Sequence, residues 1–367
     1  MWTRSYRSVL DQMVSLGFNV IRLHFSNEML RNTTATFGLA FDLNPELEDL
    51  TPVEVMDKIV DYAGVVGLQI ILDRNSARMK GYANETLWYI PEDPYYTEEL
   101  FVSDWVMLAK RYVGTAVIGV DLWNEPKDPC TWGAGLDTDW NAAAERVGNA
   151  IQAVNPDLLI IVEGIQNNSW WGSNLEGVAT HPIRLSVPNK VVYSVHEYPN
   201  DAAHVPGFNQ SWINDPTFPN NMRGRWNKNF GYLVQQNIAP VYVGEFGTTL
   251  RDEKDFIWLK LWLRYMNGEF LQDGVNELKT GQMGLSWTFW CISIDADSER
   301  IKGNFGGILL NDWYTVNEYK MAILTQFESL PTQAPTVQPV YSDYLHTLGS
   351  QIVDVNNNAV RLTGINW

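Results

Sequence analysis

The sequence predicts an α/β fold, a (β/α)8 TIM barrel that is circularly permuted so that its first strand lies at the C-terminal end of the chain. Two observations predict it. Short apolar runs alternate with amphipathic segments over residues 1–330, and one more strand-like run follows a proline-rich segment, within residues 345–367. The length of 367 residues suits a single barrel with insertions, since such barrels reach about 250 residues or more as one unit.

The strands are predicted from apolar runs with almost no polar interruption. Such runs are typical of parallel strands that are buried on both faces. Seven are present, at residues 19–23, 68–73, 117–122, 158–163, 191–196, 241–245 and 285–290. Because each is followed by a helix-like segment, they predict seven consecutive βα units.

The helices are predicted from amphipathic segments between these runs. Residues 6–16 place their apolar side chains on one helical face. The segment Pro52–Val66 follows Thr51, and Glu54 stands three residues after that threonine, which is a capping box. Residues 140–154 end at an Asn-Pro pair, which stops a helix.

The eighth strand is predicted at the C-terminal end. Residues 331–344 are rich in proline and predict an extended linker. Residues 351–354 and 360–365 then predict a hairpin around a run of asparagines. Since the first and last strands of a barrel are neighbours, residues 345–367 can complete the same domain as residues 1–330. The alternative is that they pack into another molecule as a strand-swapped oligomer, although we expect a monomer.

Composition excludes several classes of protein. The net charge of −17 argues against nucleic acid or an anionic membrane as a partner. No apolar run is long enough to span a membrane, and we expect no signal peptide at the N-terminus. The two cysteines exclude a disulfide scaffold and leave open whether they pair. The five histidines lack the spacing of common metal sites, so we expect no metal or other cofactor.

Catalytic side chains of such barrels lie at the C-terminal ends of the strands. Those ends carry Arg22, Asn124, Glu125, His196, Tyr198, Glu245 and Trp290. Two carboxylates in this set suit the acid/base and the nucleophile of a retaining glycosidase, although either alone could simply cap a loop. The 16 tryptophans and 16 tyrosines, many of them after strands, suit a cleft that stacks on sugar rings.

Several motifs resemble glycoside hydrolase family five, especially its endo-β-1,4-glucanases. They are Val-Ile-Arg-Leu at 20–23, Trp-Asn-Glu-Pro at 123–126, the run through His196 and Tyr198, Gly-Glu-Phe-Gly at 244–247 and Trp-Thr-Phe-Trp at 287–290. The resemblance covers nearly the whole chain. It also implies the permutation, because the family's barrel opens with a hairpin and Gly-Ile-Asn-Trp, which stands here at residues 364–367.

The resemblance implies roles for the charged groups. Glu125 would act as general acid and then as general base, and Glu245 as the nucleophile that forms a glycosyl-enzyme. Arg22 and Tyr198 would both donate hydrogen bonds to the Glu245 carboxylate.

The resemblance also implies the groups that hold sugar. Asn124 would bind the 2-hydroxyl, and His196 would orient the acid or bind the adjacent sugar. Trp290 would form the platform under the sugar that is cleaved, with Trp367 and Trp171 as further stacking residues. Trp170, the residue before Trp171, would line the product side of the cleft together with it.

The chain departs from the family at two positions near the expected site. Asn75 stands where the family has the histidine of Asp-Arg-His, and His24 stands where it has the proline of Arg-Leu-Pro. Asparagine keeps a donor and an acceptor but loses length and charge. The two changes could compensate each other or be unrelated, and they predict reduced activity.

The predicted function is therefore an extracellular retaining endo-β-1,4-glucanase that acts on cellulose or a soluble β-glucan oligosaccharide. One alternative is a β-mannanase or mixed-linkage glucanase with the same site, because cleft loops decide the substrate. Another is a weakened or engineered barrel that binds glycans without hydrolysing them.

Overall fold

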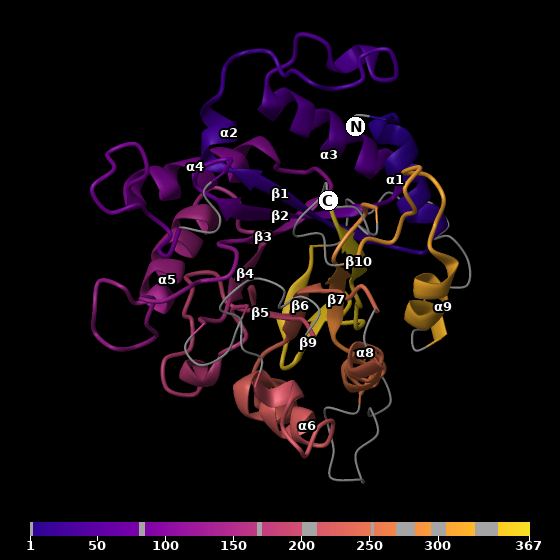
Figure 1. Ribbon diagram of the computed structural model, residues 1–367. Coiled ribbons are helices and arrows are strands. Elements are labelled where there is room, and N and C mark those ends of the chain that lie inside the picture. The colour runs from indigo at the N-terminus through magenta and orange to yellow at the C-terminus, as the bar shows by residue number, and fades with distance from the viewer. Residues whose placement is uncertain are drawn as a thin grey trace.

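The computed structural model shows a closed barrel of parallel strands surrounded by helices (Figure 1). It describes residues 3–80, 85–166, 171–199, 211–250, 253–268, 283–294, 306–326 and 344–367. The strands follow one another around the barrel in the order β1-β10-β7-β6-β5-β4-β3-β2. Their bounds are β1 Val20–Ser26, β2 Gln69–Ser76, β3 Val117–Asp121, β4 Leu159–Glu163, β5 Val191–Glu197, β6 Val241–Phe246, β7 Ser286–Phe289 and β10 Thr363–Asn366.

The C-terminal strand closes the barrel. β10 pairs in parallel with β1, where Asn366 lies opposite Arg22, and with β7, where Thr363 lies opposite Trp287. The predicted (β/α)8 barrel is therefore confirmed. In this structure, residues at the two ends of the described chain form adjacent strands.

The predicted hairpin is present beside its turn. Val353 forms an antiparallel bridge with Ala359, and the Val360 N–H donates to the Ile352 carbonyl at 2.9 Å. β9 (Gln351–Val353) also pairs antiparallel with β8 (His346–Leu348), which the sequence did not predict. The second arm does not stay paired with β9 as far as residue 365, because β10 forms its ladders with β1 and β7.

The β8–β9 hairpin covers the N-terminal end of the barrel. Leu345, Ile352 and Leu362 form one buried cluster with side chains near the start of the barrel strands, such as Val20 and Leu159. The Lys190 ammonium, just before β5, donates to the Leu345 carbonyl at 2.7 Å. This end of the barrel is closed by packing, and the catalytic side chains of such barrels lie at the opposite end.

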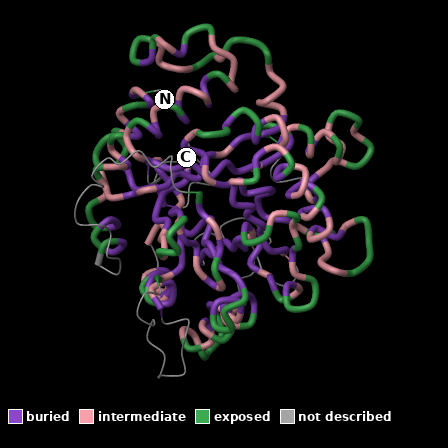
Figure 2. Tube along the Cα trace, turned by 180° about the vertical axis from the view of Figure 1, so that it is seen from behind, coloured by how far each residue is buried: buried purple, intermediate pink, exposed green. Residues whose placement is uncertain are grey.

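Helices cover the outer face of the barrel, and Figure 2 shows buried residues concentrated in its centre. The capping box at the start of α3 is confirmed, because the Thr51 side chain accepts from the Glu54 N–H and the Glu54 carboxylate accepts from the Thr51 N–H. The helices are α1 Tyr6–Ser15, α2 Asn27–Arg31, α3 Pro52–Val66, α4 Glu98–Arg111, α5 Trp140–Gln152, α6 Asn221–Trp226, α7 Tyr232–Gln235, α8 Glu253–Met266 and α9 Glu318–Gln326. Short 3-10 turns lie at Pro45–Leu47, Glu176–Ala179 and Ser211–Ile213, and a π-helical turn lies at Asn227–Gly231.

Two strands extend further than the apolar runs predict. β1 continues to Ser26 and β2 to Ser76, because their backbones keep pairing past the last apolar residue. The register places His24 opposite Asp73, so polar side chains at the ends of both strands meet.

Two predictions fall on residues outside the described ranges. They concern Trp170 and most of the predicted linker at 331–344. Cys130 and Cys291 are both buried and form no disulfide with each other. Within the described ranges, no helix combines the length and apolar character needed to cross a bilayer.

Candidate active site

Arg22 is the centre of a buried polar network at the C-terminal end of the barrel. Its Nε donates to Asp121 Oδ2 at 2.9 Å, and its Nη1 donates to Glu245 Oε1 at 2.6 Å. Its Nη2 donates to Asp73 Oδ1 at 2.8 Å and to Asn124 Oδ1 at 2.9 Å. Although burial opposes the charge, the three carboxylates raise the pKa of Arg22 well above its usual value. One fixed cation on β1 thus organises groups from three other strands, β2, β3 and β6.

Glu245 receives two strong donors. Arg22 binds one of its oxygens, and the Tyr198 hydroxyl donates to the other at 2.7 Å. Burial, followed by the charge of Glu245, raises the pKa of Tyr198 well above its usual value, so the hydroxyl stays a donor. Each oxygen of the Glu245 carboxyl group is thus bound by one donor, which holds the group in a fixed orientation.

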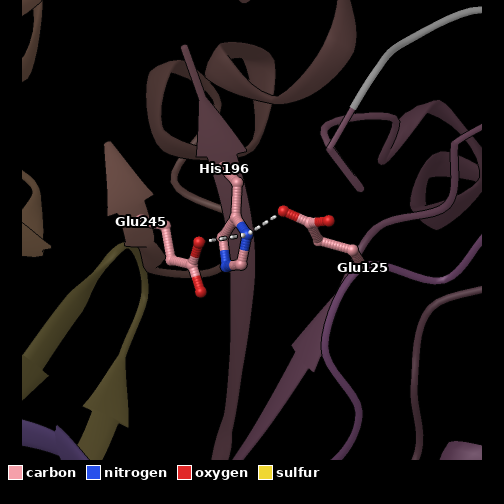
Figure 3. Close-up of side chains that lie close together, drawn as sticks. All are labelled: Glu125, His196 and Glu245. Carbon is pink, nitrogen blue, oxygen red and sulfur yellow. Dashed lines mark hydrogen bonds and ion pairs between the residues drawn. The ribbon is translucent and has the colours of Figure 1, made fainter. Parts of the chain in front are cut away.

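Glu125 lies across His196 from Glu245 (Figure 3). His196 Nδ1 is 3.1 Å from Glu125 Oε1, 3.3 Å from Glu163 Oε1 and 3.6 Å from Glu245 Oε2. One ligand atom from each of Glu125, His196 and Glu245 lies within 4.8 Å of the others. Two carboxylates this close match a retaining glycosidase, whose carboxyl groups lie about 5–5.5 Å apart, and are too close for an inverting one.

The same three side chains satisfy the distances for a metal site. The donor set does not favour a cation, however, because both oxygens of Glu245 already accept hydrogen bonds and one donor is the Arg22 guanidinium. A metal ion there would lie beside a fixed positive charge. The arrangement is therefore better suited to proton transfer and nucleophilic attack.

Two glycines leave room for the side chains of His196 and Glu163. A Cβ on Gly244, just before Glu245, would lie 2.7 Å from His196 Nε2. A Cβ on Gly172 would overlap Glu163 Oε1. Side chains at either position would displace the histidine or the buried glutamate.

The aromatic residues predicted to stack on sugar lie around this network. Trp290 follows β7, and its ring meets that of His24 edge to face with centroids 5.3 Å apart. Trp171 meets the Tyr198 ring in the same way at 5.3 Å. The Trp367 backbone continues the β10–β1 ladder, because its N–H donates to the Arg22 carbonyl at 3.0 Å.

The two unusual positions also meet. Asn75 Nδ2 lies 3.4 Å from His24 Nδ1. The closer partners of His24 are Asp73 Oδ2, 2.6 Å from Nδ1, and Asn366 Oδ1, 3.1 Å from Nε2.

Sequence reasoning missed four buried residues of the network. Three are acids that end apolar strands: Asp73, Asp121 and Glu163. The signal that pointed to Glu245, an acid at the end of an apolar strand, applied equally to them. Asn366, the fourth, lies next to the predicted Trp367 and had no separate signal.

Comparison with known proteins agrees with this geometry. Residues 1–296 match the family model described as cellulase (glycosyl hydrolase family 5). The chain belongs to that family. The resemblance seen in the motifs is thus confirmed for the family, while the permuted chain order is a separate question.

Relatives of this family 5 member include two bacterial endoglucanases. The chain is 41% identical to an endoglucanase of Paenibacillus polymyxa over 334 residues, which cover 88% of the chain and 77% of that protein. It is 33% identical to the major extracellular endoglucanase of Xanthomonas campestris over 336 residues, and this match spans only 63% of that protein.

Solved structures of family 5 enzymes share the fold. An endocellulase of Pyrococcus horikoshii in complex with cellotetraose superposes with a TM-score of 0.73 at 33% identity, covering 89% of this chain and 87% of that one. The catalytic domain of the Xanthomonas enzyme also gives a TM-score of 0.73, at 32% identity, covering 89% and 88% of the two chains.

Proposed function

We propose that the protein is a retaining endo-β-1,4-glucanase that hydrolyses internal bonds of cellulose or soluble β-glucan. The observation that carries the proposal is the close pair Glu125 and Glu245, whose oxygens approach within 4.8 Å. The endoglucanase relatives and the cellotetraose complex of a related endocellulase support the choice of substrate.

The reaction proceeds in two displacements at the anomeric carbon. In the first, Glu125 gives its proton to the glycosidic oxygen while Glu245 attacks the anomeric carbon, so the leaving sugar departs and a glycosyl-enzyme forms. In the second, Glu125 takes a proton from water, which attacks the same carbon and releases Glu245. Two inversions leave the product with the β configuration.

The surrounding groups tune this pair. Arg22 and Tyr198 donate to the two oxygens of Glu245 and hold its carboxyl group in position, while His196 Nδ1 lies 3.1 Å from the Glu125 carboxyl group. Asn124 accepts from Arg22 through Oδ1, which directs its Nδ2 toward a sugar 2-hydroxyl.

The sugar-binding residues form the wall of the cleft. Trp290 is the platform beneath the cleaved sugar, and Trp171 and Trp367 stack on neighbouring sugars. The Asn75 amide lies beside His24, and the His24 ring packs against Trp290, so Asn75 places a polar group close to this platform.

The chain order is permuted relative to the family, with residues 345–367 supplying the first barrel strand of the same domain. Two observations support this: β10 lies between β1 and β7, and the family match ends at residue 296, before that strand. We propose that the protein acts outside the cell, because its Xanthomonas relative is named a major extracellular endoglucanase. We also propose a monomer, because β10 closes the barrel of its own chain.

The test is hydrolysis of a chromogenic cello-oligosaccharide, with the product anomer followed by NMR. We expect turnover that yields the β-anomer first and is abolished in Glu245→Gln. Asn75→His is measured alongside, because activity gained there would assign a weakened site to Asn75. Faster hydrolysis of mannan or mixed-linkage glucan would overturn the substrate, and binding without turnover in all variants would overturn the activity.

A further inference from the structure

His24 is a partly buried polar residue that the proposed reaction does not use. It lies on β1 two residues after Arg22, and its side chain is 17% exposed. Both ring nitrogens are within hydrogen-bond distance of oxygen, Nδ1 at 2.6 Å from Asp73 and Nε2 at 3.1 Å from Asn366. The His24 ring also packs against the Trp290 ring in an edge-to-face arrangement, with an angle of 76° between the two ring planes.

The orientation of the Asn366 amide is fixed by its surroundings. Its Nδ2 faces three backbone carbonyls, those of Gly244 at 3.0 Å, Phe289 at 3.2 Å and Thr288 at 3.3 Å. A flipped amide would place an oxygen against three oxygens, so Oδ1 must be the atom that faces His24. The Arg22 Nη1 donates to that same Oδ1 at 3.3 Å, which agrees with this assignment.

The second partner of His24 is also a pure acceptor. Asp73 gives Oδ1 to Arg22 and Oδ2 to His24. Although burial opposes it, Arg22 and then His24 lower the pKa of Asp73, which keeps this carboxylate ionised. The Asn75 amide lies 3.4 Å from Nδ1 and is too distant to compete with a 2.6 Å contact.

Two acceptors require two donors. A neutral imidazole has one N–H, so one of its nitrogens would point a lone pair at an oxygen, whereas the imidazolium donates to both.

We propose that His24, in its doubly protonated form, is a positioning residue that ties Asp73 on β2 to Asn366 on β10 and thereby holds the Trp290 ring in place for sugar binding. His24 acts through Trp290 and contacts no reacting atom. The inference rests on the proposed function to the extent that Trp290 is the sugar platform.

Loss of the second ring proton of His24 then makes the position of the Trp290 ring less well defined. One hydrogen bond becomes a contact between two lone pairs, so the ring turns and its packing against Trp290 is disturbed. The consequence is a KM that rises on the alkaline side while kcat changes less, because the carboxylate pair keeps its own donors, Arg22 and Tyr198.

The kinetic test uses two variants and a matched control. His24→Phe keeps a ring beside Trp290 and removes both donors, and His24→Gln keeps one donor and cannot titrate. We expect KM for cellotetraose to rise about tenfold in His24→Phe, less in His24→Gln, and to lose its alkaline rise in both. His346→Phe, on β8 at the closed end of the barrel, serves as control and should keep the wild-type profile.

A second measurement does not depend on turnover. Nitrogen-15 NMR of the histidine rings should show both nitrogens of His24 protonated, with the signal absent in His24→Gln. Calorimetric binding of cellotetraose to Glu245→Gln should weaken as that second proton is lost. If the wild type shows the same pH-dependent binding of cellotetraose but does not hydrolyse it, the proposed activity fails and the role of His24 stands.

The proposal is overturned by either of two results. The first is a His24 ring with one unprotonated nitrogen under the conditions where the sugar binds. The second is a wild-type KM and pH profile in folded His24→Gln, with folding checked by thermal melting. Should His24→Phe fail to fold, His24→Gln alone decides.

Discussion

The backbone N–H of Glu125 donates a hydrogen bond of 2.7 Å to Oε2 of Glu163. Glu125 has φ of +49°, in the left-handed region that costs a non-glycine residue about 1–2 kcal/mol. Glu163 is fully buried, and burial, with nearby acids adding to it, raises the pKa of its carboxyl group well above the usual value. A residue that sequence reasoning overlooked therefore holds the proposed acid/base in an unfavourable backbone conformation.

Replacement of Glu163 tests whether this hydrogen bond positions Glu125. In Glu163→Ala the Glu125 N–H loses its acceptor, and we expect kcat to fall about 10–100-fold with little change in KM. Glu163→Gln keeps an oxygen that can accept from that N–H and should retain most of the activity. Steady-state kinetics on a cello-oligosaccharide measure both, and a wild-type kcat in Glu163→Ala would exclude a positioning role.

Tyr198→Phe removes the hydroxyl that donates to Glu245. A hydrogen bond to a charged group contributes about 1.5–3 kcal/mol, so kcat/KM should drop about 10–100-fold while the fold is unchanged. Tyr232→Phe is the matched control, because its hydroxyl donates to the Leu175 carbonyl outside the site. Equal losses in the two variants would mean that the effect is one of stability.

Asp121 predicts a pH dependence of stability. Burial raises the pKa of Asp121 to about 6 from 3.8. Between these values the folded state binds more protons than the unfolded state, so the free energy of unfolding falls as pH rises from about 4 to about 6. The contribution of this one group is at most about 3 kcal/mol.

Asp121→Asn cannot titrate and should show a shallower fall in the free energy of unfolding over that range. Urea unfolding at several pH values measures the slope. Asp61→Asn, at an exposed position of α3, should keep the wild-type slope. A slope in Asp121→Asn that equals that of the wild type would refute the assignment.

The β8–β9 hairpin is predicted to contribute stability and not catalysis. Ile352 is buried in the cluster at the closed end of the barrel, so Ile352→Ala should lower the free energy of unfolding by about 2–5 kcal/mol. Because the site lies at the other end, kcat at a temperature where the variant is folded should stay unchanged. Val355→Ala, at an exposed position, is the control. A kcat that fell together with stability would show coupling between the two ends.

The apolar runs by themselves determined the barrel and the place of its main charged residues. A strand buried on both faces must be apolar along its length, and all strands of a parallel barrel end on the same face. Arg22, Glu125, His196 and Glu245 follow such runs, so their meeting could be predicted without knowing any distance. The capping box at Thr51 is equally local, because a side chain and a backbone three residues apart decide it.

Only the tertiary structure decided which partners these residues take. His24 meets Asp73 and Asn366 because barrel closure places β1 between β2 and β10, and that register is not encoded in any one segment. Glu163 reaches the backbone of Glu125 from the neighbouring strand, and β10 pairs with β1 and β7 instead of extending the hairpin that begins at β9. Local patterns fix the preferences of each segment, whereas hydrogen-bond partners are set by long-range packing of the closed barrel.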